Sequence, residues 1–283
     1  MESPELVEGS YRKEKAEISE GPETNSLGHR DAFEKIPILI IALTELMIYA
    51  GNVQGAVWAH VMLLTTLVIC GALVGDHELQ RTYQILMLLP VLRLVNLSMP
   101  LFFDMTLYSF IFTYAPLSIP VAIIAFSQKF TKEEVGLTSK NTPVYALLGL
   151  LVSIPLGMGE YFIIRPDYLI PDLSFLNLLQ LIIVMVFFVG LVEEIIFRSL
   201  LQTRLEKVFG TWQGLLVTSL LFGLMHSGYG TFYEILYVSF VGLTIGYIFQ
   251  KTKSLFLITI VHGFVNVFLF GIIPHVGMGL DFF

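Results

Sequence analysis

The sequence has few charged residues and a single cysteine, and both shortages narrow the possible structures. Asp, Glu, Lys and Arg make up 14% of the 283 residues, against about 25% in a typical soluble domain. Hydrophobic residues make up 55%, and the mean hydropathy is +0.77. Cys70 alone cannot form an internal disulfide. The composition therefore predicts a polytopic membrane protein that is not built on a disulfide framework.

A basic patch with interleaved aromatic residues is also missing, so no nucleic-acid partner is expected. The net charge is −7 at pH 7, and much of the negative charge lies in residues 1–35. This segment is polar and poor in aromatic residues, which is typical of disorder. No signal peptide precedes the first apolar run near Ile36, so we expect this run to be an uncleaved membrane helix.

Long apolar runs dominate the remaining sequence. A helix that spans a bilayer needs about 20 apolar residues, and about eight or nine runs approach or reach this length. The two shortest are 36–50 and 212–226. The predicted spans are residues 36–50, 55–75, 83–103, 106–126, 144–164, 175–200, 212–226, 233–250 and 255–273.

The basic residues of the loops support this arrangement through the positive-inside rule. With the N-terminus in the cytoplasm and nine alternating spans, Arg165 is the one basic loop residue on the outer side. The inner loops then hold Arg81, Lys129, Lys132, Lys140, Arg204, Lys207, Lys251 and Lys253. Nine spans place the C-terminus outside, whereas eight would place it inside. The predicted location is the cell membrane, or the endoplasmic reticulum membrane of a eukaryote.

Residues 127–143 form the longest polar connection after the N-terminal segment and divide the apolar region. We predict a disordered cytoplasmic tail over 1–35, N-terminal transmembrane helices over 36–126, a cytoplasmic loop over 127–143 and a functional core over 144–283. No inverted repeat of the transporter kind is visible. The predicted fold is an all-α polytopic transmembrane bundle with an internal cavity.

Three ionisable residues interrupt the apolar run that begins at Phe175: Glu193, Glu194 and Arg198. A charge at the centre of a membrane helix costs roughly 2.5–3.5 kcal/mol, so such residues need partners. Glu194 and Arg198 are four residues apart and can pair on one helix face. Glu193 is rotated by about 100° from Glu194 and needs a different partner.

Polar residues also interrupt two of the following apolar runs. Phe222 and His226 share one helix face, as do His262 and Asn266. At 1.5 Å per residue, all three clusters lie roughly 10–20 Å from the cytoplasmic ends of their spans. Residues 227–230, Ser-Gly-Tyr-Gly, break the helix after His226. Irregular backbone at membrane depth is tolerated where it lines a cavity, so the break predicts a hydrated internal chamber.

A carboxylate, two imidazoles and a carboxamide around one water are a set suited to hydrolysis. Glu193 would act as general base and later as proton donor, and His226 would hold the water. His262 and Asn266 would donate hydrogen bonds to an oxyanion. Glu193, His226 and His262 would also suit a catalytic zinc ion with an open fourth position. The HExxH spacing of metalloproteases is absent, so the signal for zinc is weak when taken alone.

These three clusters, in this order, resemble the CPBP family of intramembrane proteases. That family includes the type II CAAX-prenyl endopeptidases, or Ras-converting enzymes, and the Abi proteins. Its motifs are EExxxR, FxxxH and HxxxN, and the resemblance covers roughly residues 143–273. The motif residues here are Glu193, Glu194, Arg198, Phe222, His226, His262 and Asn266.

The resemblance implies that Glu193 and His226 activate the water and that His262 and Asn266 form the oxyanion site. Glu194 and Arg198 would be supporting residues. With this resemblance, a metal-free glutamate mechanism is favoured over a zinc site. It also implies an intramembrane endopeptidase whose substrate is a membrane-associated protein or peptide, of which prenylated CaaX-type C-termini are one class. Ser199 departs from the family pattern, in which a glycine often follows the motif arginine.

Structural roles remain open for each of these residues. Glu194 and Arg198 can form a purely structural ion pair, each histidine can be a packing residue, and Asn266 can join two helices by a hydrogen bond. The alternative function is a non-enzymatic immunity, scaffold or transport protein that uses the same polar cluster for binding. Arg93 is expected to be paired or to face a cavity.

Overall fold

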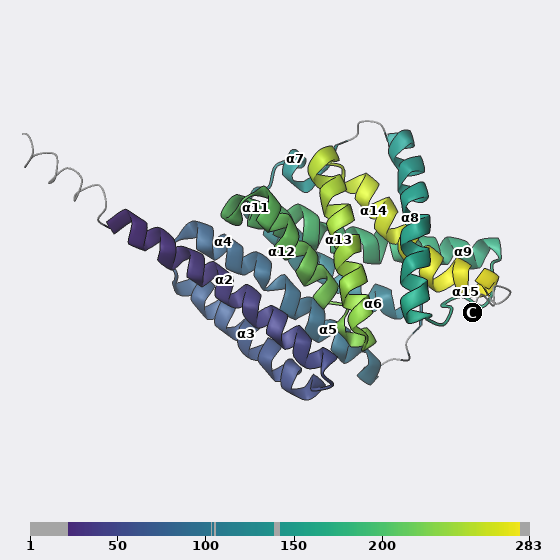
Figure 1. The fold of residues 1–283 in the computed structure, drawn as a ribbon, viewed down its shortest axis with the longest axis horizontal. Helices are drawn as coiled ribbons and strands as arrows, with labels where there is room; N and C mark the ends of the chain where they lie inside the picture. The colour runs from purple at the N-terminus through teal and green to yellow at the C-terminus, as the bar shows by residue number, and fades with distance from the viewer. Residues whose placement is uncertain (1–21, 103, 105, 139–141, 278–283) are drawn as a thin grey trace, which may run out of the picture.

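The computed structural model describes residues 22–277 apart from 103, 105 and 139–141. Within these residues every regular element is helical and no strand occurs. Helices satisfy the backbone of long apolar runs internally, as a bilayer requires. Figure 1 shows α2 (Pro22–Tyr49) and α3 (Val53–Leu73) side by side at one edge of the molecule, and α8 (Thr142–Ile164) toward the opposite side. The predicted all-α class is confirmed.

Seven helical stretches in the described residues are long and apolar enough to cross a membrane. They correspond to seven of the nine predicted spans, and they establish a multi-pass membrane protein. The stretches are Val53–Leu73, His77–Leu101, Ser109–Ser127, Thr142–Ile164, Phe175–Phe209, Phe232–Thr252 and Leu255–Val276.

The other two predicted spans are also helical but are not among the seven. Residues 212–226 fall largely in α12 (Thr211–Leu224), whose 14 residues reach about 21 Å at 1.5 Å each. That is less than the roughly 30 Å of a hydrocarbon core. Residues 36–49 form the second half of α2, whose first half is rich in charged residues.

The N-terminal segment differs from the prediction. Residues 22–35 were expected to belong to a disordered tail, but α2 already begins at Pro22. Residues 1–21 lie outside the described residues. Once the apolar half of α2 has formed a helix, extending it through Glu, Lys and Arg costs little, because these residues have high helix propensity. Tertiary contacts also hold its end, since Glu34 is buried and Tyr83 donates a hydrogen bond to Phe33 O.

A continuous helical run over residues 175–209 passes through the centre of the molecule. It consists of α9 (Phe175–Ile182), η1 (Ile183–Gly190), α10 (Leu191–Glu194), η2 (Ile195–Gln202) and α11 (Thr203–Phe209). The η1 and η2 segments are π-helical, a conformation that often occurs at functional sites. The run ends at Gly210, whose φ of 91° favours glycine. The two glutamates thus occupy a short α-helical turn between π-helical segments.

One hydrophobic core joins the helices on both sides of the 127–143 loop. It includes Ile41 of α2, Leu89 of α5 (Leu88–Phe102) and Leu117 of α6 (Ser109–Ser127). Leu200 of η2 and Val238 of α13 (Phe232–Thr252) belong to the same buried cluster. The N-terminal helices are therefore packed directly against the C-terminal core, which lets them contribute to a shared site.

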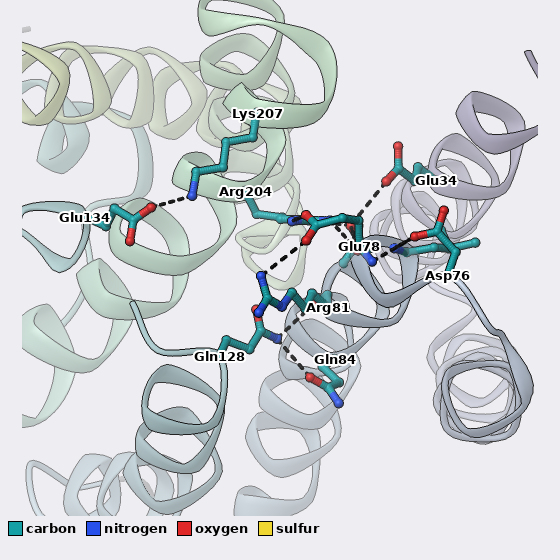
Figure 2. Close-up of polar contacts among 11 residues, drawn as sticks. Glu34, Asp76, Glu78, Arg81, Gln84, Gln128, Glu134, Arg204 and Lys207 are labelled. Carbon is teal, nitrogen blue, oxygen red and sulfur yellow. Dashed lines mark hydrogen bonds and ion pairs between the residues drawn. The ribbon is translucent and has the colours of Figure 1, made fainter. Parts of the chain in front are cut away.

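Polar side chains join the same two regions at one end of the bundle (Figure 2). Arg204 of α11 reaches α4 (His77–Leu86), where it pairs with Glu78 and donates to Thr82 at 2.8 Å. Lys207 pairs with Glu134 of α7 (Lys132–Val135). Partial burial raises the pKa of Glu134, but hydrogen bonds from Lys207 and Thr131 and the Lys207 charge outweigh it, so this pKa lies below its usual value. Residues predicted for different inner loops therefore meet at one end.

Candidate functional site

A cavity of about 340 Å³ lies between α5, α6, the central helical run, η3 (Ser227–Tyr229) and α14 (Leu255–Val267). The four predicted catalytic residues Glu193, His226, His262 and Asn266 all line it. They come from three separate segments of the chain, so only the tertiary fold brings them together. The predicted supporting residues Glu194, Arg198 and Phe222 do not line the cavity and are buried behind it.

Glu193 faces the cavity from α10 and has a partner that the sequence did not reveal. The Tyr114 hydroxyl of α6 donates a hydrogen bond to Glu193 Oε1. The other oxygen, Oε2, lies 3.8 Å from His262 Nε2. Glu193 is 7% exposed, so this carboxylate is held on one side and open on the other toward the cavity.

Glu194 points away from Glu193, as the helical rotation predicts, and forms a buried network. Arg198 Nη1 lies 3.1 Å from Glu194 Oε1, which confirms the predicted pairing at four-residue spacing. The same oxygen lies 2.6 Å from Nδ1 of His262. Arg198 also donates to Gly242 O at 3.3 Å. Glu194 therefore connects the motif arginine to one of the two histidines of the cavity.

Phe222 supports both histidines and the arginine through its ring. The ring centroid lies 5.2 Å from that of His226 and 5.6 Å from that of His262, where the contact is edge-to-face. The guanidinium carbon of Arg198 lies 4.2 Å from the same centroid, within the range of a cation–π contact. The phenylalanine of the FxxxH motif is thus a packing centre, which a buried, 2% exposed position also indicates.

His226 lies directly after the end of α12, where the sequence predicted a helix break. α12 ends at Leu224, and Ser227–Tyr229 form a single 3₁₀ turn before Gly230, whose φ is 73°. His226 Nδ1 lies 3.0 Å from Phe222 O. Because His226, Gly228 and Tyr229 line the cavity, the prediction that the break borders an internal chamber is confirmed.

Two glycines allow the helix that carries His262 to approach the central helical run. A Cβ atom on Gly263 of α14 would lie 2.6 Å from Val186 Cγ2 and 2.7 Å from Val186 Cα. A Cβ on Gly190 would lie 3.1 Å from the backbone nitrogen of Gly263. Small residues at such crossings let helix backbones come close in a membrane. This close approach brings His262 within reach of Glu194.

Several cavity residues were missed or only partly anticipated from the sequence. Arg93 and Asn96 of α5, Tyr114 of α6 and Tyr229 of η3 line the cavity with the four predicted residues. Arg93 fulfils both expectations, since it is paired with Glu45 and faces a cavity. No sequence motif singled out Tyr114 or Asn96.

The departure at Ser199 has a structural explanation. Its hydroxyl donates a hydrogen bond of 2.7 Å to Val135 O of α7. This contact fastens the loop between α6 and α8 to η2. Ser199 is fully buried and is not among the residues that line the cavity.

The described residues contain no group of three or more His, Cys, Asp or Glu side chains with a geometry that could hold a metal ion. His262 offers its Nδ1 to Glu194, and His226 uses its Nδ1 on a backbone carbonyl. The residues considered for zinc, Glu193, His226 and His262, share this cavity, and the two Nδ1 contacts leave Nε2 of both histidines uninvolved in them.

Comparison with protein families gives a match within the second half of the chain. Residues 175–268, about a third of the chain, match the family model described as type II CAAX prenyl endopeptidase Rce1-like. No curated protein and no solved structure matches the chain. The matched segment contains the three clusters and all four predicted catalytic residues of the cavity. Over residues 175–268 the chain is therefore similar to the Rce1-like family of type II CAAX prenyl endopeptidases.

Proposed function

We propose that this protein hydrolyses a peptide bond inside the membrane by a water molecule that Glu193 activates. One observation carries the proposal: a single cavity of about 340 Å³ collects Glu193, His226, His262 and Asn266 from three separate segments of the chain. A volume of this size lies within the usual range of small-ligand sites. Burying such polar groups in an apolar bundle is costly, so their convergence supports a chemical role.

The contacts of His226 support a role as the partner of the water. A carbonyl oxygen only accepts hydrogen bonds, so the proton of the neutral imidazole lies on Nδ1, facing Phe222 O at 3.0 Å. Nε2 is then unprotonated and can accept a hydrogen bond from a water in the cavity. With Glu193, His226 would hold that water with both of its hydrogens directed at acceptors, which leaves a lone pair free for attack.

The contacts of His262 support the opposite role, that of a donor. Its Nδ1 lies 2.6 Å from Glu194 Oε1, and a carboxylate accepts hydrogen bonds. As an imidazolium, His262 would donate Nδ1–H to Glu194 and Nε2–H to the oxygen of the substrate carbonyl. The carboxamide of Asn266 would be the second donor to this oxyanion, and its side chain has no hydrogen bond to another described residue. One lost oxyanion donor typically lowers kcat by about 10²–10³-fold.

The reaction then proceeds in two steps. The water oxygen attacks the carbonyl carbon while Glu193 takes a proton, which gives a tetrahedral oxyanion bound by His262 and Asn266. When the carbon–nitrogen bond breaks, the protonated Glu193 gives its proton to the leaving amine. The products are a carboxylic acid and a free amine, and Glu193 returns to the carboxylate form.

A prenylated C-terminal peptide is the proposed substrate class. The family match supports it. We expect the wild-type protein in detergent micelles to cleave a farnesylated fluorogenic peptide faster than the same peptide without the lipid. Cleavage of neither peptide, nor of unrelated hydrophobic peptides, by folded protein would contradict the proposed function.

The proposed mechanism uses no metal ion, because Glu193 can activate the water as a general base by itself. We therefore expect unchanged cleavage after chelation and dialysis, and elemental analysis should find no zinc equimolar with the chain. Zinc that is bound in equimolar amount, and whose removal abolishes activity that zinc then restores, would overturn the metal-free mechanism.

Tyr114 is expected to orient Glu193 during the reaction. Tyr114→Phe removes one hydrogen bond to this carboxylate, and such bonds to charged groups contribute about 1.5–3 kcal/mol. We therefore expect kcat to fall roughly tenfold or more while the protein remains folded. The matched control is Tyr108→Phe at the start of the same helix, α6. Tyr108 is exposed and does not line the cavity. Equal kcat for both variants would exclude this role.

A further inference from the structure

Arg93 is a buried cation in the wall of the cavity, and no motif of the matched segment includes it. It belongs to α5, outside residues 175–268. Its side chain is 5% exposed, and it lines the same cavity as Glu193, His262 and Asn266. A buried arginine inside a membrane helix is costly and usually marks a functional site. The mechanism above gives it no task.

Glu45 of α2 holds Arg93 from the side away from the cavity. Arg93 Nε donates to Glu45 Oε1 at 2.9 Å, and Nη2 pairs with Oε2. The Ser227 hydroxyl donates to Glu45 Oε2 at 2.8 Å, and His60 Nε2 lies 3.2 Å from Oε1. Glu45 does not line the cavity and is fully buried. This two-point attachment fixes the plane of the guanidinium group.

The attachment leaves one nitrogen of Arg93 available. Nε and Nη2 bind Glu45, and Nη2 also donates to Met225 O. Among the described residues, Nη1 makes no hydrogen bond and no ion pair. Gly228 stands beside this nitrogen, since a Cβ placed on Gly228 would lie 4.0 Å from Nη1, and Gly228 itself lines the cavity. A charged donor is thus held in fixed orientation with an open position at the cavity.

We propose that Nη1 of Arg93 binds the C-terminal carboxylate of the substrate, so that the enzyme recognises a free chain end close to the bond that it cleaves. This inference rests on the proposed function. A carboxylate is the group that a guanidinium recognises best. Glu45 balances the charge of Arg93 while the cavity is empty, so the bound carboxylate gains a charge-assisted hydrogen bond rather than a full unscreened ion pair.

The dimensions of the cavity agree with this assignment. A sphere of the cavity's volume, about 340 Å³, is about 9 Å across, and two to three extended residues span about 7–10 Å. A carboxylate at Arg93 and a scissile carbonyl near Glu193 can therefore belong to one peptide with two or three residues between them. A longer C-terminal extension would have to leave the cavity before its end reached Arg93.

The test compares two peptides that differ only at the C-terminus, one with a free carboxylate and one with a carboxamide. We expect wild-type protein to cleave the acid with a kcat/KM about 10–100-fold higher than that of the amide. Binding of both peptides to the Glu193→Gln protein provides a readout that does not depend on cleavage, and the acid should bind tighter by a similar factor.

Variants of Glu45 and Arg93 test whether Arg93 causes the preference for the peptide with a free carboxylate. The double substitution Glu45→Gln/Arg93→Gln removes both charges together, so it leaves neither group as an uncompensated buried charge. Its preference for the acid should disappear, whereas Glu45→Gln alone keeps Arg93 and should keep the preference. Arg93→Lys should weaken the preference, because an ammonium group lacks the fork that Glu45 holds. Thermal unfolding establishes that each variant is folded.

The outcomes separate this inference from the proposed function. Equal cleavage and equal binding of acid and amide by proteins that carry Arg93 would overturn the inference and leave the protease function intact. A preference for the acid that persists in the folded double variant would also overturn it, because another group would then bind the carboxylate. If the Glu193→Gln protein prefers the acid but the wild type cleaves neither peptide, the carboxylate site stands and the proposed function fails.

Discussion

Glu193→Gln is expected to lower kcat by about 10²–10⁴-fold, the usual contribution of general acid–base catalysis. Glutamine has nearly the same shape and can still accept the hydrogen bond from Tyr114. It cannot take a proton from water, so the nucleophile and the later proton donor are both lost. Cleavage of the farnesylated peptide in micelles measures the effect, and the temperature of unfolding should change little.

The control for this substitution is Glu234→Gln. Glu234 of α13 is also a fully buried carboxyl residue within a membrane-spanning helix, but it does not line the cavity. Its variant should keep kcat close to the wild-type value. If the folded Glu193→Gln protein retained wild-type kcat, Glu193 would not be the general base.

Arg198→Met is expected to destabilise the protein by about 3–5 kcal/mol, the usual cost of removing one partner from a buried ion pair. Arg198 and Glu194 are 1% and 0% exposed, so the remaining carboxylate would have neither water nor a full counter-ion. The contact of the guanidinium with the Phe222 ring would also be lost. Thermal unfolding in detergent should show the change as a large decrease in the unfolding temperature.

The double variant Glu194→Gln/Arg198→Met distinguishes stability from catalysis. Removing both charges should restore much of the lost stability, because replacing a buried pair by neutral residues is often nearly neutral. Activity should remain low, since the glutamine no longer provides the carboxylate at 2.6 Å that holds His262 as a donor. Recovery of full activity together with stability would show that the network is structural and that His262 does not depend on Glu194.

Local sequence patterns predicted the parts of this structure that depend on short-range geometry. The spacing of Glu194 and Arg198 fixes one helix face, and the ion pair at 3.1 Å follows from it. The run Ser227–Gly230 predicted the helix break beside His226, and the structure has it there. The residue at which a helix begins was harder to predict. α2 begins at Pro22, and its first residues have a composition that also suits a disordered tail.

Contacts between distant parts of the chain could not be predicted in the same way. Tyr114 and Glu193 are 79 positions apart, and Arg93 and Met225 are 132 apart. Ser227 and Glu45 are separated by 182 positions. A single polar residue in an apolar run has no periodicity that would reveal its partner. Only the packing of α2, α5 and α6 against the central helical run decides which of these residues meet.

The sequence by itself determined the all-helical membrane class, the seven spans that correspond to long apolar helices and the three polar clusters that line or support the cavity. These features follow from backbone hydrogen bonding in lipid and from the helical repeat, which both act over a few residues. The tertiary structure decided that Tyr114 holds Glu193 and that Glu45 orients Arg93 at the cavity wall. Those contacts depend on side-chain packing between helices far apart in the sequence, and the shape of the whole bundle sets that packing.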